Sequence, residues 1–354
     1  MAHSIKEKLY KSFSSDLGID LGTANSLVLI AGQGIVLNEP SVVAINQKTG
    51  RVVAIGNEAK AMIGRTPQHI TAVRPLVNGV ISDFEVTEEM IGYFIRRAQE
   101  LTSRRLLRPR IVIGVPSNIT NVERRAVRDA AKNAGAREVH IIEEPMAAAI
   151  GIRLPVHEPI GNMIIDIGGG TTDVAVISLG GVVRSKNVHL AGDRLNQDIV
   201  SYVRDEFKIL LGEKTAEDVK IAIACASELE DSLEASIRGR DLVTGLPREV
   251  VVTDADIREA IGPTLNGLVT AVREVLEETP PELIADIMER GIVLTGGGSL
   301  LRGMQKRLMS DLKIPIVVSE DPLTAVARGT GVVLEDLDFY REQLVDSDDE
   351  LPPQ

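Results

Sequence analysis

The sequence is poor in the residues on which disulfide-rich, metal-binding and DNA-binding proteins depend. Its single cysteine, Cys225, excludes an internal disulfide bond, and its histidines are too scattered for a metal cluster local in the sequence. Lysines and arginines number 39 against 51 aspartates and glutamates, so the net charge of -12 argues against non-specific binding to nucleic acid. We therefore expect no nucleic-acid partner and a reducing, cytoplasmic environment.

Long apolar runs are also missing. No window approaches the length that spans a bilayer, and the first residues lack the apolar core of a signal peptide. We expect a chain that is neither exported nor transmembrane. Its 354 residues, 44% of them hydrophobic, suffice for a substantial core and are compatible with two domains.

What the sequence does contain is one short pattern used twice. An apolar run ends in Asp20 or Asp166, a turn of small residues follows, and a second apolar run begins. This pattern predicts a β-hairpin at each place. Small residues at the bend let backbone N–H groups converge on an anion, and a carboxylate just before the bend suits a hydrated magnesium ion held against phosphates. The pair therefore indicates a nucleotide bound by two related half-molecules.

A third glycine turn differs from these two. Gly296, Gly297 and Gly298 follow the apolar run 292–295, but no carboxylate precedes them. We expect this turn to border an uncharged part of the nucleotide, the ribose or the base. Glycines also form turns for purely conformational reasons, so the occurrence of three such turns is what favours nucleotide binding. The sequence has no P-loop, and neither acidic turn opens a helix as the dinucleotide-binding motif does.

Hydrolysis of a terminal phosphoryl group requires a residue that orients the attacking water. Glu144 is the best-placed acid, because it stands between a strand predicted over 139–142 and a helix predicted over 145–150. Glu143, beside it, is expected to face differently. A carboxylate at position 144 could instead serve only to stabilise the N-terminus of the helix, a contribution of about 0.3–1 kcal/mol. The spacing leaves both interpretations open.

Strands and helices alternate along the chain, which predicts an α/β fold. Thr120 and Thr253 are expected to cap helices, and in the first of these Val122, Val127 and Ala130 are expected to face inward. The other expected elements are β-rich segments over 35–45 and 52–55, strands over 111–115 and 250–252, helices over 87–101 and 216–229, a helix after Gly192, a helix over 281–290 and a helix beginning at Ser299.

The two ends of the chain differ from the rest. Ile5, Leu9 and Phe13 recur at a spacing of four with lysines between them, which predicts a basic amphipathic helix. Such a segment can lie in an anionic membrane surface, or it can be a frayed terminus that docks on the domain. Residues 346–354 are acidic and contain prolines, and we expect them to be disordered.

Taken together, these motifs resemble the actin, sugar-kinase and heat-shock-chaperone ATPases, and more closely the MreB family of bacterial actins. The similar runs are Asp20–Asn25, Arg74-Pro75 with Gly79–Phe84, Glu143–Gly151, Asp166–Thr172, Gly239–Pro247, Thr279–Leu283 and Leu294–Leu301. The nucleotide motifs occur throughout the superfamily, whereas the runs at 239–247 and 279–283 are particular to the family. The match covers almost the whole chain outside its two ends.

The resemblance implies a duplicated actin-like ATPase fold, with two α/β domains and the nucleotide in the cleft between them. Domain I would span 16–150, with an inserted subdomain at about 35–74, and would be completed by about 328–345. Domain II would span 151–327, with an inserted subdomain at about 192–250. Residues 1–15 would form an amphipathic membrane segment, and residues 346–354 the acidic tail.

The resemblance also assigns roles to residues. Asp20 and Asp166 would hold Mg²⁺ through water, and Glu144 would position the attacking water. The first phosphate loop would comprise Gly22, Thr23, Ala24 and Asn25, the second Gly168, Gly169, Gly170, Thr171 and Thr172, with Gly192 and Asp193 near the ribose and Gly296, Gly297 and Gly298 at the adenine. Ile5, Leu9, Phe13, Leu106 and Leu107 would contact the membrane.

The function implied is ATP-dependent polymerisation into paired protofilaments on the inner face of the cytoplasmic membrane, with slow hydrolysis of ATP to ADP. Membrane proteins of the wall-elongation machinery would be partners, and rod cell shape the outcome. One departure concerns nucleoside selectivity: Ala222 stands where the family usually has a glutamate, and Glu228, further along the predicted helix, is a candidate replacement. A small-molecule kinase of the same superfamily is the alternative. A chaperone would require a further peptide-binding domain, which we do not expect.

Overall fold

The computed structural model describes residues 15–102, 107–117 and 119–345, which form two compact units. The first unit contains the described residues up to Ile160, together with Ile177–Val183 and those from Leu323 onward. The second unit contains Gly161–Val176 and Arg184–Pro322. Each unit has its own hydrophobic core, and both combine strands with helices, as the alternating pattern predicted.

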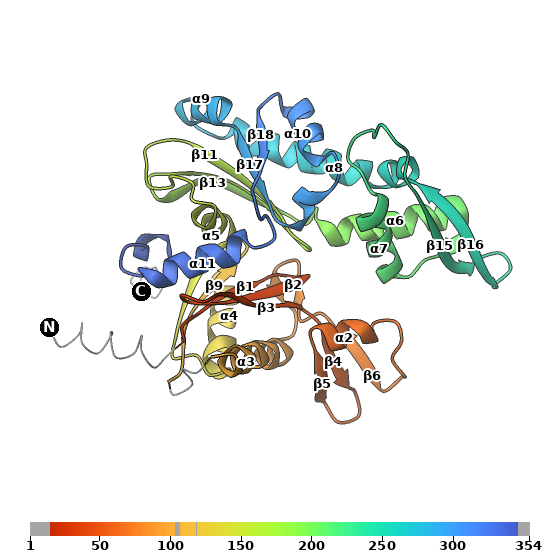
Figure 1. Ribbon diagram of the computed structural model, residues 1–354, viewed down its shortest axis with the longest axis horizontal. Helices are drawn as coiled ribbons and strands as arrows, with labels where there is room; N and C mark the ends of the chain where they lie inside the picture. The colour runs from red at the N-terminus through yellow and green to blue at the C-terminus, as the bar shows by residue number, and fades with distance from the viewer. Residues whose placement is uncertain (1–14, 103–106, 118, 346–354) are drawn as a thin grey trace. The chain divides into compact units, whose positions relative to one another are not determined.

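The first unit is built on a five-stranded sheet in the order β10-β9-β1-β2-β3. The strands are β1 (Leu17–Leu21), β2 (Asn25–Ile30), β3 (Gly34–Pro40), β9 (Arg110–Val115) and β10 (Glu138–Glu143). β10, β9 and β1 run parallel, whereas β1, β2 and β3 are successively antiparallel. Figure 1 shows α3 (Phe84–Glu100) and α4 (Asn121–Asn133) on one face of this sheet, and α5 (Glu144–Gly151) and α11 (Ala325–Glu335) on the other.

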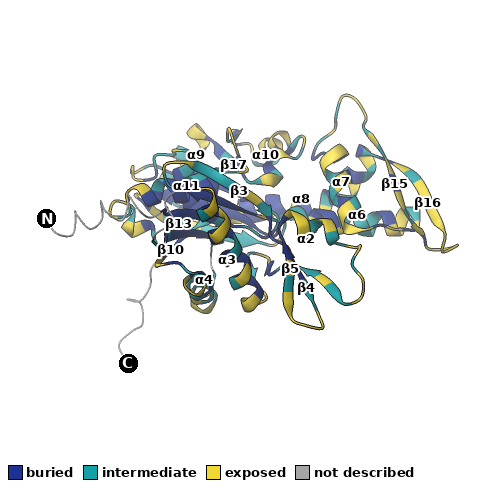
Figure 2. Ribbon diagram, turned by 60° about the horizontal axis from the view of Figure 1, so that its bottom comes forward, coloured by how far each residue is buried: buried dark blue, intermediate teal, exposed yellow. Residues whose placement is uncertain are grey.

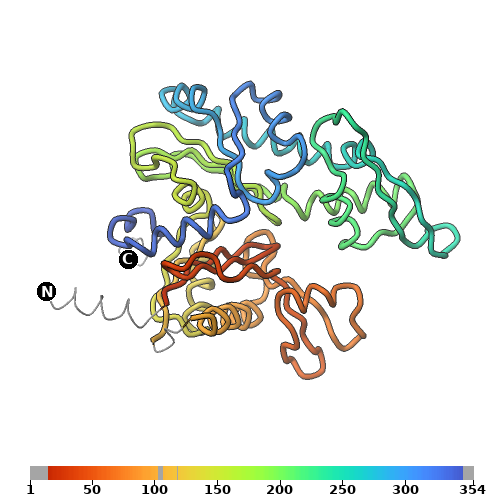
Figure 3. The backbone as a smooth tube through the Cα atoms, viewed as in Figure 1, coloured from red at the N-terminus to blue at the C-terminus, as the bar shows by residue number. Residues whose placement is uncertain are grey.

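A smaller sheet extends the first unit. It has the order β5-β4-β6, with α2 (Asn57–Met62) packed against it, and Figure 3 traces this segment in orange. Its strands are β4 (Val43–Asn46), β5 (Arg51–Ile55) and β6 (Ile70–Val73). The hairpin of β7 (Leu76–Val77) and β8 (Val80–Ile81) follows, and its two turn residues both have positive φ, 53° at Asn78 and 74° at Gly79. That conformation is the one that an Asn-Gly pair favours between strands.

A short 3₁₀ turn, η2 (Arg341–Gln343), lies near the end of the described chain.

The second unit has a five-stranded sheet in the order β13-β12-β11-β17-β18. Its strands are β11 (Asn162–Ile167), β12 (Thr172–Ser178), β13 (Gly181–Val188), β17 (Ile292–Thr295) and β18 (Ile316–Val318). The helices are α6 (Gly192–Phe207), α7 (Glu213–Ile223), α8 (Asp254–Glu277), α9 (Pro281–Arg290), the 3₁₀ turn η1 (Gly297–Leu300) and α10 (Met304–Leu312). A second small sheet has the order β14-β15-β16, from β14 (Ile209–Leu210), β15 (Glu234–Asp241) and β16 (Pro247–Thr253).

Burial follows the pattern of the two large sheets. Every residue of β11 and of β12 is buried, and β1 and β9 are nearly so. Exposed residues lie on the outer faces of the helices and along the β15–β16 hairpin, as Figure 2 shows. Both large sheets therefore hold strands that are covered on their two faces, which is why their sequences are continuous apolar runs.

The predicted helix caps are confirmed. The Thr120 and Thr253 side chains each accept a hydrogen bond from the backbone N–H three residues on, and Glu123 and Asp256 complete the two capping boxes. Pro281 is the first residue of α9, as predicted. These signals act through contacts within one helical turn, so tertiary packing does not override them.

The segment 35–45 is β-rich, as predicted, and forms parts of β3 and β4, which belong to different sheets. Three local predictions are wrong. Val122 is 79% exposed, because it lies in the first turn of α4 and only residues from Val127 onward reach the core. The helix expected over 216–229 ends at Ile223, since Ala224 is extended and the next residue pairs with Arg302. Ser299 lies inside η1, and α10 begins only at Met304.

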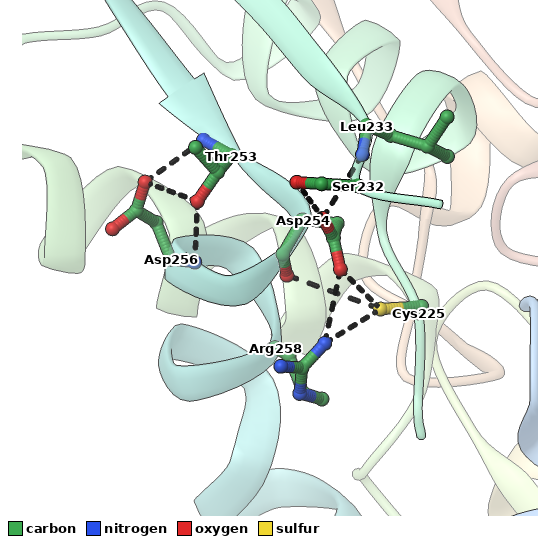
Figure 4. Close-up of polar contacts among 7 residues, drawn as sticks. All are labelled: Cys225, Ser232, Leu233, Thr253, Asp254, Asp256 and Arg258. Atoms are coloured by element: carbon green, nitrogen blue, oxygen red, sulfur yellow. Dashed lines mark hydrogen bonds and ion pairs between the residues drawn. The ribbon is translucent and has the colours of Figure 1, made fainter. Parts of the chain in front are cut away.

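A buried polar network closes the base of the second small sheet (Figure 4). Asp254, the first residue of α8, is 4% exposed and accepts hydrogen bonds from the Ser232 hydroxyl (2.9 Å) and the Leu233 N–H (3.0 Å). Its other oxygen pairs with Arg258 at 3.0 Å, and the same guanidinium lies 3.3 Å from the Cys225 sulfur. The pKa of Asp254 is lowered, and the hydrogen bond from the Leu233 backbone N–H contributes most to this shift.

We predict that Asp254→Ala lowers the free energy of unfolding by about 3 kcal/mol, because it removes a buried carboxylate on which the Ser232, Leu233 and Arg258 donors converge. Asp218→Ala, which removes an ion pair whose side chains are 54% and 60% exposed, should cost less than about 1 kcal/mol. Urea denaturation of both variants at pH 7 measures the difference. Equal losses would show that the network adds no more than a surface ion pair.

Candidate functional site

The first unit gathers two predicted site residues at one edge of its large sheet. Asp20 of β1 lies opposite Gly114 of β9, and Gly114 lies opposite Ile142 of β10, two residues before Glu144. These three strands are parallel, so Asp20 and Glu144 both stand at the carboxyl ends of strands, where open α/β sheets bind ligands. The Glu144 side chain approaches the same glycine: a Cβ on Gly114 would lie 3.7 Å from Glu144 Cγ.

Burial sets the electrostatics of this edge. It raises the pKa of Asp20 to about 7, from an ordinary value of 3.8. A carboxylate desolvated in this way favours a cation close to it, because a positive charge restores the stabilisation that water no longer supplies. Burial also raises the pKa of Glu143, and the nearby Arg124 guanidinium opposes that shift.

The first turn, Gly22 to Asn25, is held by residues distant in the sequence. The Ser41 hydroxyl donates to the Gly22 carbonyl at 2.6 Å, and the Ser41 N–H donates to the Ala24 carbonyl at 3.0 Å. The Gly79 N–H, at the tip of the β7–β8 hairpin, donates to Thr23 Oγ1 at 2.9 Å. The turn is therefore braced by Ser41 and Gly79, which are distant from it in the sequence.

Glu144 is positioned by close helix packing. It is the first residue of α5, with the N-cap at Glu143, and α5 packs against α11. A Cβ on Gly151 would lie 2.0 Å from the Ala325 carbonyl oxygen, and one on Gly329 would lie 1.8 Å from the Ala147 carbonyl oxygen. Only glycine fits at these two positions, so α5 and α11 meet backbone to backbone at Ala147 and at Gly151.

The second turn lies in the second unit and likewise follows a strand that ends near an aspartate. Asp166 is 7% exposed near the end of β11, and the turn that follows closes with a hydrogen bond from the Gly168 N–H to the Thr171 carbonyl (2.9 Å). Gly169 and Gly170 lie at its bend. Thr172 begins β12, and its hydroxyl donates to the Leu190 carbonyl at 2.7 Å. β11 and β12 are neighbours in the sheet, so the second predicted hairpin is confirmed, as is the first.

The start of α6 lies against this turn. The Gly192 N–H donates to the Gly168 carbonyl at 3.1 Å, and the Asp193 N–H donates to the Gly169 carbonyl at 2.7 Å. Lys220 of α7 donates from Nζ to the Gly192 carbonyl at 2.9 Å. The residues expected near the phosphates and the ribose are thus brought together in the second unit, with an additional cation beside them.

The third turn also meets the second. Gly296 has φ of 77°, and a Cβ there would lie 2.3 Å from Asp166 Oδ1. A Cβ on Gly298 would lie 2.2 Å from Ile167 Cγ2. Gly297 begins η1 between them. Gly296 and Gly298 are therefore required by close approach to β11, and the third turn lies directly against Asp166.

The end of α7 is tied to the segment that follows η1. Arg302 donates from Nη1 to the Ile221 carbonyl at 3.0 Å, and its own carbonyl accepts from the Ala226 N–H at 2.7 Å. Ala222 is exposed in the last turn of α7. Glu228 lies beyond the end of that helix, so the expectation that it follows Ala222 on the same helix is wrong.

Two residues of this site were missed by sequence reasoning. Ser41, which is fully buried and braces the first turn, follows a proline in what reads as an ordinary bend. Lys220 sits in a helix with other charged residues and carries no motif. Neither has a local signal, because each acts through a contact with a residue at least 17 positions away along the chain.

Each unit presents one of the two carboxylates predicted to act on magnesium, Asp20 in the first and Asp166 in the second. Among the described residues, no three His, Cys, Asp or Glu side chains gather closely enough to bind a metal. Magnesium commonly takes only one or two carboxylates and fills its other positions with water and phosphate oxygens, so a single buried carboxylate such as Asp20 is compatible with a hydrated cation beside it.

The predicted membrane residues are mostly beyond reach of the structure. Ile5, Leu9, Phe13 and Leu106 lie outside the described residues, and Leu107 is partly exposed. In the part of the chain that is described, no helix has the length and apolarity needed to cross a membrane.

Two α/β units, each presenting an aspartate at a strand end followed by a turn of small residues, define a class: this is the actin-like ATPase fold, as the predicted architecture stated. Residues 14–342 match the model of the MreB/Mbl protein family. The chain belongs to the MreB/Mbl family, and the resemblance drawn from its motifs is confirmed.

Similar proteins agree along nearly the full length. The cell shape-determining protein Mbl of Bacillus subtilis is 50% identical, over 92% of this chain and 97% of its own. The cell shape-determining protein MreB of Escherichia coli is 52% identical, over 94% and 97%. The structure of MreB5 of Spiroplasma citri, solved with ADP and with AMPPNP, superposes with a TM-score of 0.88 at 38% identity, covering 93% of this chain and 98% of that one.

The close approach at Gly296 yields a prediction. Gly296→Ala should weaken ATP binding by more than about tenfold, because the new Cβ would displace Asp166 and the backbone of β11. Gly262→Ala, a helical position with no atom within 4 Å of the added Cβ, should leave ATP affinity unchanged. Calorimetric titration with ATP and Mg²⁺ compares the two variants. Equal affinities would mean that the third turn does not shape the site.

The raised pKa of Asp20 yields another. In the nucleotide-free protein, the unfolded chain loses this proton near pH 4 and the folded protein only at about pH 7, so ionisation of Asp20 lowers the free energy of unfolding as pH rises through that window. Asp20→Asn removes this loss. When the pH is raised from 4.5 to 8, the free energy of unfolding of the variant should increase relative to that of the unmodified protein by ~1 kcal/mol or more. Urea denaturation of both proteins at the two pH values measures this change. A difference that is independent of pH would contradict the assignment.

Proposed function

We propose that this chain is an ATP-dependent cytoskeletal protein that polymerises into filaments at the cytoplasmic membrane and thereby directs cell-wall elongation and rod shape. The proposal is carried by one observation: each of its two units presents a carboxylate and a braced turn of small residues, one at Asp20 and one at Asp166. The names of relatives about 50% identical, which are cell shape-determining proteins, support it.

A single ATP would engage both units. Gly22, Thr23, Ala24 and Asn25 would meet its phosphates from the first unit, and Gly168 to Thr172 would meet them from the second. Lys220 and the start of α6 would lie near the ribose, with the third turn at the adenine. Magnesium, held through water by Asp20 and Asp166, would neutralise phosphate charge and orient the terminal phosphoryl group. The ADP and AMPPNP complexes of MreB5 are consistent with this assignment.

Glu144 would orient the water that attacks the terminal phosphoryl group, giving ADP and phosphate. Its place at the carboxyl end of β10, separated only by β9 from the strand that contains Asp20, supports this role over that of a mere helix-terminal carboxylate. The backbone-to-backbone contact of α5 and α11 would keep it fixed. Because the proposed outcome of the reaction is a change in the state of the filament and not the release of a metabolite, we expect slow turnover.

The nucleotide would act as a switch. A ligand that contacts both units can favour one arrangement of them only through its different affinity for each arrangement. ATP and ADP differ by the one phosphoryl group that both acidic turns would contact. Hydrolysis would thus change the arrangement that polymerises. The alternative of a small-molecule kinase is not favoured, because the relatives that match this chain over nearly their whole length are cell shape-determining proteins.

Association with the membrane is proposed from the sequence of the N-terminal segment. Its apolar positions 5, 9 and 13, with lysines between them, are suited to an anionic bilayer surface. The absence of a spanning helix among the described residues leaves surface association as the mode that we propose. Wall-elongation proteins embedded in the membrane would then meet the filament there.

The proposal is tested by sedimentation and electron microscopy of the purified protein with ATP, Mg²⁺ and anionic liposomes. Filaments on the vesicles are expected without any acceptor substrate. Asp166→Ala should abolish both ATP binding and filaments. Glu144→Gln should keep ATP affinity within about threefold but slow phosphate release by at least about tenfold, because only the water-orienting group is lost. Bare vesicles with the unmodified protein, under conditions in which it binds ATP, would overturn the cytoskeletal assignment.

A further inference from the structure

The two acidic hairpins differ in the residue that lies opposite the aspartate. In the first hairpin, Asp20 of β1 pairs with Leu27 of β2. In the second, antiparallel pairing outward from the hydrogen bond that closes the turn brings Asp173 of β12 opposite Asp166 of β11. The second hairpin therefore has two carboxylates at a pair of positions where the first has one.

The hydrophobic core of the second unit agrees with this register. Ile165 of β11 and Val174 of β12, which the register pairs, both belong to that core. Asp166 and Asp173 are the next residues towards the turn, and successive side chains of a strand point to opposite faces of a sheet. The two aspartates therefore share the face that is turned away from this core, with Cβ atoms about 4.5–5.5 Å apart, the usual spacing of directly opposite residues.

The Asp173 carboxylate is deeply buried and is fixed by the next strand. Asp173 is 1% exposed, and Asn187 of β13 donates from Nδ2 to its Oδ2 at 2.8 Å. Asp166, opposite it, is also buried. Two carboxylates that are held opposite each other away from water repel, and a cation close to both removes the repulsion. The pair stands directly before the turn that is proposed to meet the phosphates.

We propose that Asp173 is a further magnesium-positioning residue of the second half-site and that, together with Asp166, it selects the magnesium complex of ATP over free ATP. This inference rests on the proposed function and adds one residue to the site already described. Magnesium takes oxygen ligands and keeps several of its waters, so two carboxylates on one face suit its hydrated ion. The same two charges oppose a polyphosphate that carries no cation, because like charges at short range repel strongly in a buried site.

The selection is tested by measuring the affinity for ATP twice, once with Mg²⁺ and once with EDTA, for the unmodified full chain and for Asp173→Asn. The variant should bind ATP more weakly with Mg²⁺ and more tightly with EDTA, because one carboxylate that favours the cation and opposes free phosphate is gone. The ratio of the two affinities should fall by at least about tenfold. The fold should be retained, since the new amide oxygen can still accept the hydrogen bond from Asn187.

A purely structural role of Asp173 would weaken binding equally under both conditions, and that result would overturn the inference, as would two unaltered affinities. Asp205→Asn removes a carboxylate of the same unit that is 60% exposed and pairs with Arg204. It is the matched charge control and should change either affinity by less than about twofold. If Asp173→Asn fails to fold, Asn187→Ala, which releases the Asp173 carboxylate, must lower the ratio in the same direction. Unmodified protein that does not bind ATP with Mg²⁺ would instead refute the proposed function itself.

Discussion

In the function that we propose, the two half-sites depend on one electrostatic constraint: the charge of a polyphosphate must be met by turns that contain no lysine. The turns can then meet that charge only with their backbone N–H groups and with a cation bound to the phosphates. Both require a turn whose backbone is already in place. The braces described above supply this. Ser41 holds the first turn, α6 holds the second, and β11 holds the third by direct contact with Gly296 and Gly298.

The same constraint explains what the sequence could predict. Asp20 and Asp166 could be singled out because the chemistry that we propose for them also needs small residues directly after them, all within ten positions. The capping boxes at Thr120 and Thr253 were recognisable for the same reason, since a cap satisfies backbone groups within one helical turn. The two hairpins and the two caps, whose causes lie within a few residues, were predicted correctly, and the family resemblance rested on short motifs of this kind.

Features caused by distant contacts could not be predicted. β15 was missed because only Ile237 and Asp241 of its eight residues are buried, so its sequence reads as polar. The end of α7 at Ile223 is imposed by Arg302, about 80 positions later in the chain. Ser41, Lys220 and the glycine contacts between α5 and α11 belong to the same group. Each is decided by packing partners that periodicity does not reveal.

The central claim is that one magnesium nucleotide is gripped by both acidic turns. It is tested most directly by a calorimetric double-mutant cycle with ATP and Mg²⁺, using Asp20→Asn, Asp166→Asn and the two combined. We predict one nucleotide bound per chain, a large loss of affinity from either substitution, and a combined loss well below the sum of the two, because both remove the same ion. Strictly additive losses, or a variant that binds magnesium nucleotide as tightly as the unmodified protein, would contradict the account.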